Sequence, residues 1–198
     1  MSPETSSAVY HLLARDEAPA VVVLKENGSS PFFLTCDHAG KAIPRRLGSL
    51  GLPASELERH IALDIGAFAV AQQLSDGLDA TLIAQPYSRL VIDCNRSPEV
   101  ATSIVEISEL TEIPGNQGLS QQDVEARRRE VFEPYHQRIT ATLDDRRERN
   151  QATVLVAVHS FTPVFKRMSR PWQVGVLYNR DTHFAHIMLD LLRNEGDL

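Results

Sequence analysis

Cysteine is scarce in this sequence. Cys36 and Cys94 are the only two cysteines in 198 residues, and they form neither a disulfide framework nor a Cys-x-x-Cys metal knuckle. Both lie inside or beside apolar runs typical of strands, where a small thiol is usually buried. The sequence therefore predicts two buried free thiols.

Long apolar runs are also missing. No stretch approaches the ~18 residues that a membrane helix needs. The N-terminus, Met1-Ser-Pro-Glu-Thr-Ser-Ser7, lacks the basic region and apolar core of a signal peptide. From these two absences we expect a protein of the cytoplasm.

Excess positive charge is a third absence. The formal net charge is -6 and the pI is about 5.6, which argues against nucleic acid as a partner. Basic residues cluster at positions 127–129 and 146–147, but acidic residues lie among them. This mixture predicts solvated helix faces.

The remaining composition, 42% hydrophobic and 23% charged, is typical of globular proteins. The chain length suits one domain with a sizeable core. We expect a loose N-terminal arm over residues 1–18 and a single domain over residues 19–198.

Strand and helix patterns alternate along this domain. This order is typical of βαβ units and predicts an α/β fold with a largely parallel sheet. Apolar runs predict strands at residues 20–24, 31–37, 80–84, 89–93, 152–158 and 172–177, and helical periodicity predicts helices at residues 61–74, 120–150 and 183–193.

The longest predicted helix begins at Ser120, the expected N-cap, with Asp123 in its first turn. Pro134 should kink or split it, because proline lacks the backbone N–H that a helix interior requires. Tyr135 and His136, just past the proline, face either the functional site or the solvent.

Two of the apolar runs end in a histidine, His38 and His159. Ligands bind beyond the carboxyl ends of parallel strands, so these imidazoles predict one shared metal site. The expected third ligand is Asp64, in the first turn of a mostly apolar helix. Zinc favours imidazole nitrogen and carboxylate oxygen, and a catalytic zinc keeps one position open for water.

Alternatives to this ligand set remain. Asp37 adjoins His38 and is the reserve third ligand, although neighbours on a strand point to opposite faces. His60 lies one helical turn before Asp64 and either orients that carboxylate or caps the helix. For either of the two strand-terminal histidines alone, a satisfied polar residue at a strand end is the simpler interpretation.

A second cluster surrounds the predicted strand at residues 89–93. Arg89 and Arg96 bracket it, and Asp93 and Asn95 lie between them. Guanidinium groups at strand ends suit bidentate capture of a carboxylate substrate. An internal ion pair between Asp93 and an arginine is the alternative. Both interpretations can be true, because one arginine can bind substrate while the other pairs with Asp93.

Five motifs follow one another along the chain: Cys36-Asp-His-Ala-Gly-Lys-Ala-Ile-Pro44, Asp64-Ile-Gly-Ala67, Ser88-Arg-Leu-Val-Ile-Asp-Cys-Asn-Arg96, Pro134-Tyr-His136 and Val158-His-Ser160. In this order they resemble the N-formylglutamate amidohydrolases, over roughly residues 30 to 198.

That family is similar to the zinc carboxypeptidases and aspartoacylase-type deacylases. The resemblance implies a mixed, mostly parallel sheet sandwiched between helices, as in the phosphorylase/hydrolase-like fold of zinc carboxypeptidases. It implies His38 and His159 as zinc ligands with an acidic third ligand. The carboxypeptidase His-x-x-Glu pattern is missing because position 41 is Lys, which leaves Asp64 as the choice.

The resemblance also carries an expectation about the carboxyl end. Members of the family continue into an Asn-x-Pro-Tyr loop and a late strand with a Glu, which by analogy would be the general base. We expect this chain to lack that segment, so the catalytic base stays unassigned.

The predicted function is zinc-dependent hydrolysis of the amide of an N-acyl amino acid. N-formyl-L-glutamate, giving formate and glutamate as in histidine degradation, is the expected substrate. Arg96, Asn95 and Arg89 would bind its carboxylate, the first two because they resemble the family's Asn-Arg pair. The alternatives are a non-catalytic carboxylate-binding relative of this fold and a metallo-carboxypeptidase. Neither nucleic acid nor a membrane is an expected partner.

Overall fold

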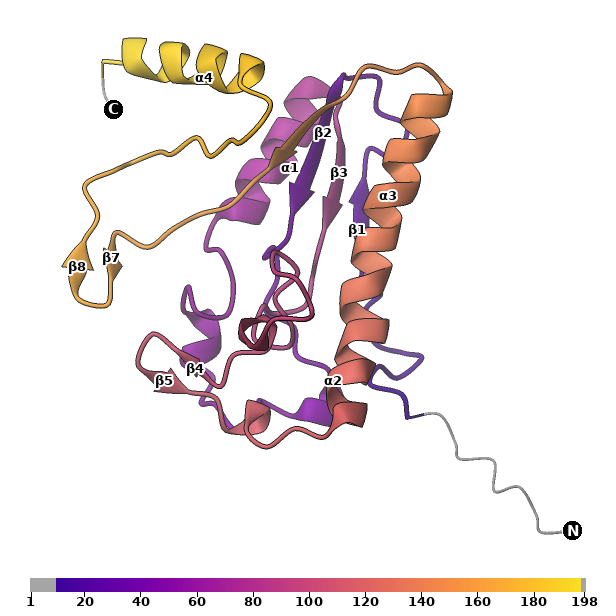
Figure 1. Ribbon diagram of the computed structural model, residues 1–198, viewed down its shortest axis with the longest axis vertical. Coiled ribbons are helices and arrows are strands. Elements are labelled where there is room, and N and C mark those ends of the chain that lie inside the picture. Colours follow the sequence, from indigo (N-terminus) through magenta and orange to yellow (C-terminus); the bar gives the residue numbers. More distant parts are fainter. Residues whose placement is uncertain (1–9, 197–198) are drawn as a thin grey trace, which may run out of the picture. The chain divides into compact units, whose positions relative to one another are not determined.

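The computed structural model describes residues 10–196 (Figure 1). The chain divides into two compact units, Met1–Phe161 and Thr162–Leu198. The single domain predicted over residues 19–198 stays a prediction. Within the described part of the chain, no helix has both the length and the apolar composition of a membrane span.

A four-stranded mixed sheet forms the centre of the first unit. Its strands lie in the order β1 (Val22–Leu24), β3 (Thr81–Ala84), β2 (Phe32–Cys36) and β6 (Val154–Ala157). β2 pairs in parallel with β3 and with β6, whereas β1 runs antiparallel to β3. The predicted mostly parallel sheet is confirmed, and the carboxyl ends of β2, β3 and β6 meet at one edge.

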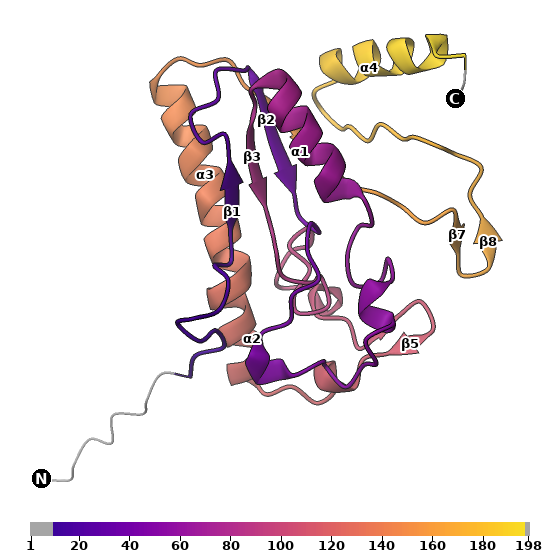
Figure 2. The same ribbon diagram turned by 180° about the vertical axis from the view of Figure 1, so that it is seen from behind.

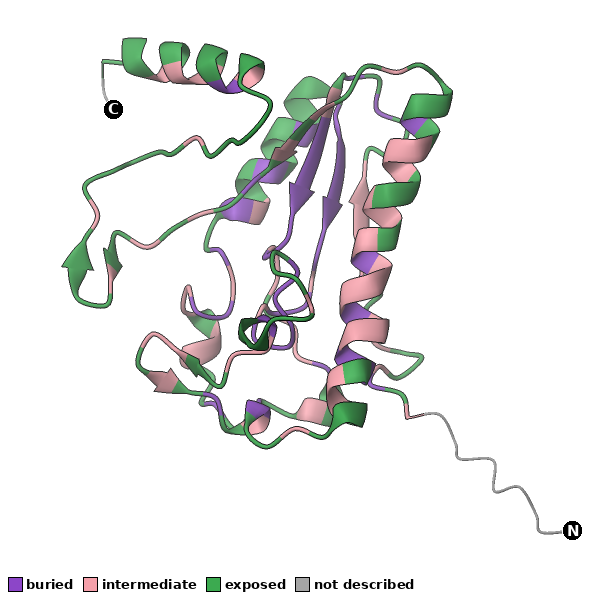
Figure 3. Ribbon diagram, viewed as in Figure 1, coloured by how far each residue is buried: buried purple, intermediate pink, exposed green. Residues whose placement is uncertain are grey.

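Helices cover both faces of this sheet, α1 (Ala67–Leu78) on one side and α3 (Glu133–Glu148) on the other (Figures 1 and 2). Leu34 of β2 packs with Ala71 of α1. Its neighbour Phe33 packs with Tyr135 of α3, because successive side chains of a strand point to opposite faces. Figure 3 shows β2 and β3 buried along nearly their whole length, as expected of strands covered on both sides.

The helix predicted over residues 61–74 is displaced in the structure. α1 begins only at Ala67, because Gly66 adopts a left-handed conformation with φ of 79° and forms its N-cap. Asp64 therefore lies in the loop before the helix and not in its first turn.

The strand predicted at residues 89–93 is wrong. These residues form turns and irregular backbone, and side chains satisfy their backbone polar groups in place of a neighbouring strand. Arg127 donates to the carbonyl of Val91, and Asn116 donates to the carbonyl of Leu90. An apolar run can thus be buried without a sheet.

The helix predicted over residues 120–150 consists of α2 (Gln121–Arg127), a π-helical turn (Arg128–Phe132) and α3. Ser120 caps α2 in a reciprocal capping box with Asp123, as predicted. The sequence predicts a kink or a split at Pro134, and the structure has a π turn that ends at Phe132, two residues before the proline. Pro134 lies in the first turn of α3, where its missing N–H costs no helical hydrogen bond.

Short elements fill the rest of the first unit. They are the 3-10 turns Arg45–Leu47, Glu56–Glu58, Ala101–Ser103 and Pro114–Asn116, and a small hairpin of β4 (Ile107–Ser108) and β5 (Thr111–Glu112). Cys36 and Cys94 are buried and free, as predicted.

Residues 10–18 of the predicted arm are anchored to this unit. The Glu130 carboxylate accepts the backbone N–H groups of Leu12 and Leu13, and the Tyr87 hydroxyl donates to the carbonyl of Ala18. The part of the arm at residues 1–9 lies outside the described residues.

The second unit contains a hairpin of β7 (Val164–Phe165) and β8 (Met168–Ser169), followed by α4 (His183–Asn194). The predicted final helix is confirmed. The strand predicted at residues 172–177 is wrong: these residues are irregular, because the hairpin strands pair with each other and leave this run without a partner in its unit.

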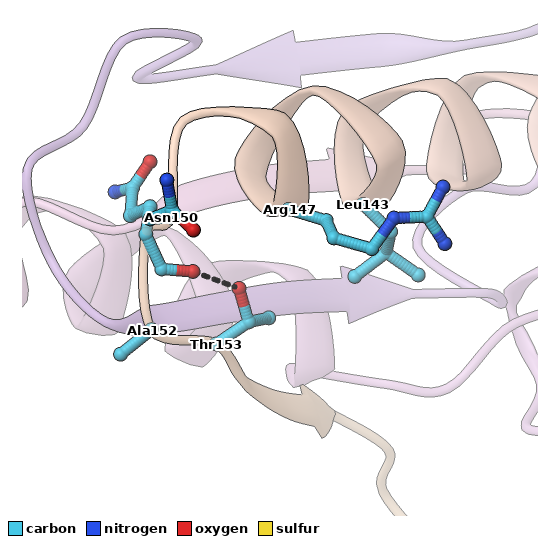
Figure 4. A pocket seen from close by; sticks show the side chains of 6 residues that line it. Leu143, Arg147, Asn150, Ala152 and Thr153 are labelled. Carbon is cyan, nitrogen blue, oxygen red and sulfur yellow. Dashed lines mark hydrogen bonds between the residues drawn. The ribbon is translucent and has the colours of Figure 1, made fainter.

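Two arginines overturn the prediction of solvated helix faces. Arg127 and Arg146 are fully buried. Arg146 donates to the carbonyls of Ser30, Pro31 and Ala152, and thereby joins the end of α3 to the starts of β2 and β6. A pocket lies at the turn between α3 and β6, where Thr153 donates to the carbonyl of Gln151 at 3.2 Å (Figure 4).

We expect Arg146→Ala to lower the free energy of unfolding by about 3 kcal/mol, because it leaves buried carbonyls without donors. The matched control is Arg147→Ala, since Arg147 is exposed and forms only a surface ion pair with Asp144. Its removal should cost less than about 1 kcal/mol. Urea unfolding followed by circular dichroism measures both, and equal losses would contradict the assignment.

Candidate metal centre

The carboxyl ends of β2 and β6 bring His38 and His159 together. β2 ends at Cys36 and β6 at Ala157, and the parallel register aligns Thr35 with Ala157. Each histidine comes two residues after its strand, so both reach the same edge of the sheet. Their ring centroids lie 5.2 Å apart.

Gly40 allows the chain after His38 to turn close to the neighbouring loop. Its backbone N–H donates to the carbonyl of Gln85 at 3.1 Å. A Cβ atom at this position would lie 1.9 Å from the carbonyl oxygen of Pro86, so a larger residue cannot follow this path.

Asp64, in the loop before α1, is the third residue that lies beside His38 and His159. Its backbone N–H donates to the carbonyl of His38 at 3.0 Å. Its Oδ2 lies 3.3 Å from His38 Nδ1 and 2.8 Å from His159 Nδ1. One ligand atom from each of the three residues falls within 4.8 Å of the others. The structure therefore brings together the three residues predicted from the sequence.

Each histidine also has a carboxylate behind it. His38 Nε2 lies 2.7 Å from Asp93 Oδ1, and His159 Nε2 lies 3.3 Å from Asp37 Oδ2. A metal-ligating histidine typically donates its second ring N–H to such a carboxylate, which fixes the tautomer and the ring orientation. The arrangement leaves both Nδ1 atoms facing Asp64 and gives Asp37, the reserve ligand, a supporting position.

The predicted arginine cluster forms internal ion pairs. Arg89 reaches Asp64 Oδ1 at 3.2 Å and Asp93 Oδ2 at 3.0 Å. Arg96 Nε lies 3.0 Å from the same Asp93 oxygen, and the backbone N–H of Asn95 donates to Asp93. Asp93 is thus surrounded by donors, and it in turn orients His38.

Two other predicted neighbours have different partners. His60 does not orient Asp64: its Nε2 lies 3.1 Å from Glu109, because residues 61–66 do not form the helix that would have aligned the two. His136 Nε2 lies 2.9 Å from the carbonyl oxygen of Cys94. Tyr135 faces the site, and its hydroxyl donates to Asp37.

Burial and hydrogen bonding set the charges of this group. Hydrogen bonds to Asp37 and Asp64 raise the pKa of His159 to about 9. Burial opposes the charged form of His38, but hydrogen bonds to Asp64 and Asp93 outweigh it and raise its pKa. Burial likewise opposes the charged forms of Asp64 and Asp93, yet their histidine partners lower both pKa values. Burial raises the pKa of Tyr135, so its hydroxyl remains a donor.

The residues present fit a zinc ion. Two imidazole nitrogens and one carboxylate oxygen are a ligand set typical of catalytic zinc. Three buried aspartates, Asp37, Asp64 and Asp93, lie around the ligand atoms, and Arg89 compensates part of their negative charge.

Comparisons with known proteins agree with this fold. A family model of the N-formylglutamate amidohydrolases matches residues 30–197. The crystal structure of the gene product Atu2144 from Agrobacterium tumefaciens is similar with a TM-score of 0.91 and 36% sequence identity, over 94% of this chain and 74% of that chain.

N-formylglutamate amidohydrolase from Ralstonia eutropha JMP134 shares the fold. Its TM-score is 0.53 at 22% identity, over 73% of this chain and 58% of that chain. A search of curated proteins finds no match.

Fold and site thus define an α/β protein with a candidate metal centre at the carboxyl edge of its sheet. The chain belongs to the N-formylglutamate amidohydrolase family, a family of hydrolases that act on amide bonds. The resemblance seen in the motifs is confirmed, and it implies a small-molecule substrate. The likeness to zinc carboxypeptidases stays a prediction.

Sequence reasoning missed three contributions to the site. It gave Asp93 only the role of an ion-pair partner for arginine, and Asp37 only the role of a metal ligand. It did not decide whether Tyr135 faces the functional site or the solvent. The available signal was the adjacency of Asp37 and His38. Neighbouring side chains at a strand end point to different sides, so Asp37 can contact a histidine other than its neighbour. No sequence pattern reveals which.

We expect His159→Ala to remove bound zinc, because it deletes one of three ligand atoms. His60→Ala is the matched control and should retain about one zinc per chain, since His60 pairs with Glu109. Mass spectrometry of metal content, on protein purified without chelator and again after zinc reconstitution, measures both. Full zinc occupancy in His159→Ala would refute the ligand assignment.

Proposed function

We propose that this chain is a zinc-dependent amidohydrolase of N-acyl amino acids and that N-formyl-L-glutamate is its substrate, with a place in histidine degradation. The observation that carries the proposal is the cluster of His38, Asp64 and His159 ligand atoms within 4.8 Å. The guanidinium group of Arg96 adjoins this cluster through Asp93, which contacts both Arg96 and His38.

His38, Asp64 and His159 would hold the zinc ion. When bound, it would polarise the amide carbonyl and lower the pKa of a water ligand to ~7. Asp93 and Asp37 hold the imidazoles of His38 and His159 so that both Nδ1 atoms face Asp64. Arg89 holds Asp64 and Asp93 in place through separate nitrogens of its guanidinium group.

Substrate carboxylate would bind at Asn95 and Arg96. The Arg96 side chain is 45% exposed. Its Nε and Nη1 atoms contact Asp93 and Thr102, which orients the guanidinium group while leaving Nη2 for a ligand. Arg89 is the more buried of the two arginines, and we assign its positive charge to the attraction of the substrate carboxylate at the same place.

The direct test is hydrolysis of N-formylglutamate by the zinc-loaded protein, measured as formate release. Formate release that depends on zinc supports the proposal. Cleavage of carboxy-terminal residues from small peptides instead would favour a metallo-carboxypeptidase. Zinc binding with no turnover of any N-acyl amino acid would favour a non-catalytic carboxylate-binding protein.

We expect Arg96→Ala to raise the KM for N-formylglutamate by roughly 10- to 100-fold, the value of one charge-assisted hydrogen bond. Metal content should stay unchanged, because Arg89 continues to hold Asp93. The control is Arg128→Ala, since Arg128 is about as exposed and pairs with Glu99 and Glu133. Steady-state kinetics measures the effect, and an unchanged KM would remove Arg96 from the carboxylate site.

A further inference from the structure

The hydroxyl of Tyr135 is connected to the candidate metal centre by a continuous chain of contacts. It donates to Asp37 Oδ1. The other Asp37 oxygen, Oδ2, lies 3.3 Å from His159 Nε2, and His159 Nδ1 lies 2.8 Å from Asp64. Each contact uses a different atom of its residue, so the chain runs unbroken from α3 to the ligand group.

The two histidines need this kind of support to different degrees. His38 is 2% exposed, and its partner Asp93 is held by Arg89, Arg96 and the Asn95 N–H. The His159 side chain is 30% exposed and follows β6, one of the two edge strands of the four-stranded sheet. Packing constrains His159 less than His38, so its ring orientation depends more on Asp37.

Tyr135 is well placed to fix Asp37. Its side chain is fully buried in a cluster with Phe33, Ile83 and Cys94, so its hydroxyl has little freedom to move. The π turn at Arg128–Phe132 lies directly before α3. Such a turn carries one additional residue and rotates the following helix by about 100°. Tyr135 lies in the first turn after that rotation.

We propose that Tyr135 is a positioning residue for the metal centre: it holds Asp37 so that Asp37 fixes the His159 ring with Nε2–H toward Asp37 and Nδ1 toward the metal. The inference rests on the proposed zinc site. It adds a role for a residue that contacts neither metal nor substrate, and it connects metal affinity to the packing of α3 on the sheet.

The test compares two variants that each remove the hydroxyl of a buried tyrosine. Tyr135→Phe should weaken zinc binding by about tenfold, the usual cost of losing an outer partner of a ligand. Tyr87→Phe is the matched control, because Tyr87 is equally buried and its hydroxyl donates to Ala18, away from the site. Competition with a chromophoric chelator measures zinc affinity, and the visible spectrum of the Co²⁺ form reports ligand geometry.

A double-mutant cycle separates positioning from a general packing effect. Asp37→Ala should weaken zinc binding at least as much as Tyr135→Phe. In the Asp37→Ala background, Tyr135→Phe should cause no further loss, because the carboxylate through which Tyr135 acts is gone. An equal loss in both backgrounds would overturn the proposal.

A measurement on the unmodified chain covers the case in which Tyr135→Phe does not fold. Nitrogen-15 NMR of the zinc-loaded protein should show His159 protonated at Nε2 and bound to metal through Nδ1. Binding through Nε2 would overturn the proposal.

The outcomes distinguish this inference from the proposed function. If the unmodified chain binds no zinc, the proposed function fails and this inference fails with it. If zinc binds and depends on His159, while Tyr135→Phe retains normal affinity and an unchanged Co²⁺ spectrum, only the role of Tyr135 is refuted.

Discussion

The parallel pairing of β2 with β6 is the interaction on which the site depends. These strands are separated by more than a hundred residues, yet their register places Thr35 beside Ala157. β6 ends level with Thr35 and β2 ends one residue later, at Cys36, so the histidines that follow the two strands reach the same edge of the sheet and meet. A one-residue slip of this pairing would shift the two histidines relative to each other. Burial of β2 by α1 and α3 holds the register, because such a slip would also exchange the apolar residues of its two faces.

Several buried charged groups in the described part of the chain have partners that compensate their charge or accept their hydrogen bonds. Asp64 and Asp93 are compensated by histidine and arginine partners, and the buried Arg127 and Arg146 donate mainly to backbone carbonyls. An uncompensated charge in such surroundings costs several kcal/mol. The two arginines replace sheet and helix hydrogen bonds where the backbone is irregular. Arg127 allows the irregular segment at residues 90–94 to be buried while Asp93 contacts His38.

Much of the fold could be predicted from local pattern. The apolar runs at β2, β3 and β6 and the Ser120 capping box are local signals, and the structure contains each of them. The errors arose where an apolar run is buried by means other than a sheet. Residues 89–93 are held by Arg127 and Asn116 from distant parts of the chain, and residues 172–177 have no strand to pair with in their unit. Neither fact is encoded within the run itself.

The candidate site also has a part that the sequence predicts and a part that it does not. His38, Asp64 and His159 could be selected from the sequence, because histidine at the end of a buried strand and aspartate in an apolar segment are costly unless they have a use. Tertiary structure alone decided their partners. Gly66 ends the loop so that Asp64 precedes α1, the π turn precedes the helix that carries Tyr135, and Asp37 and Asp93 each lie behind a different histidine. Side-chain identity is written in the sequence, but which nitrogen meets which oxygen depends on register and helix rotation, and these are set by long-range packing.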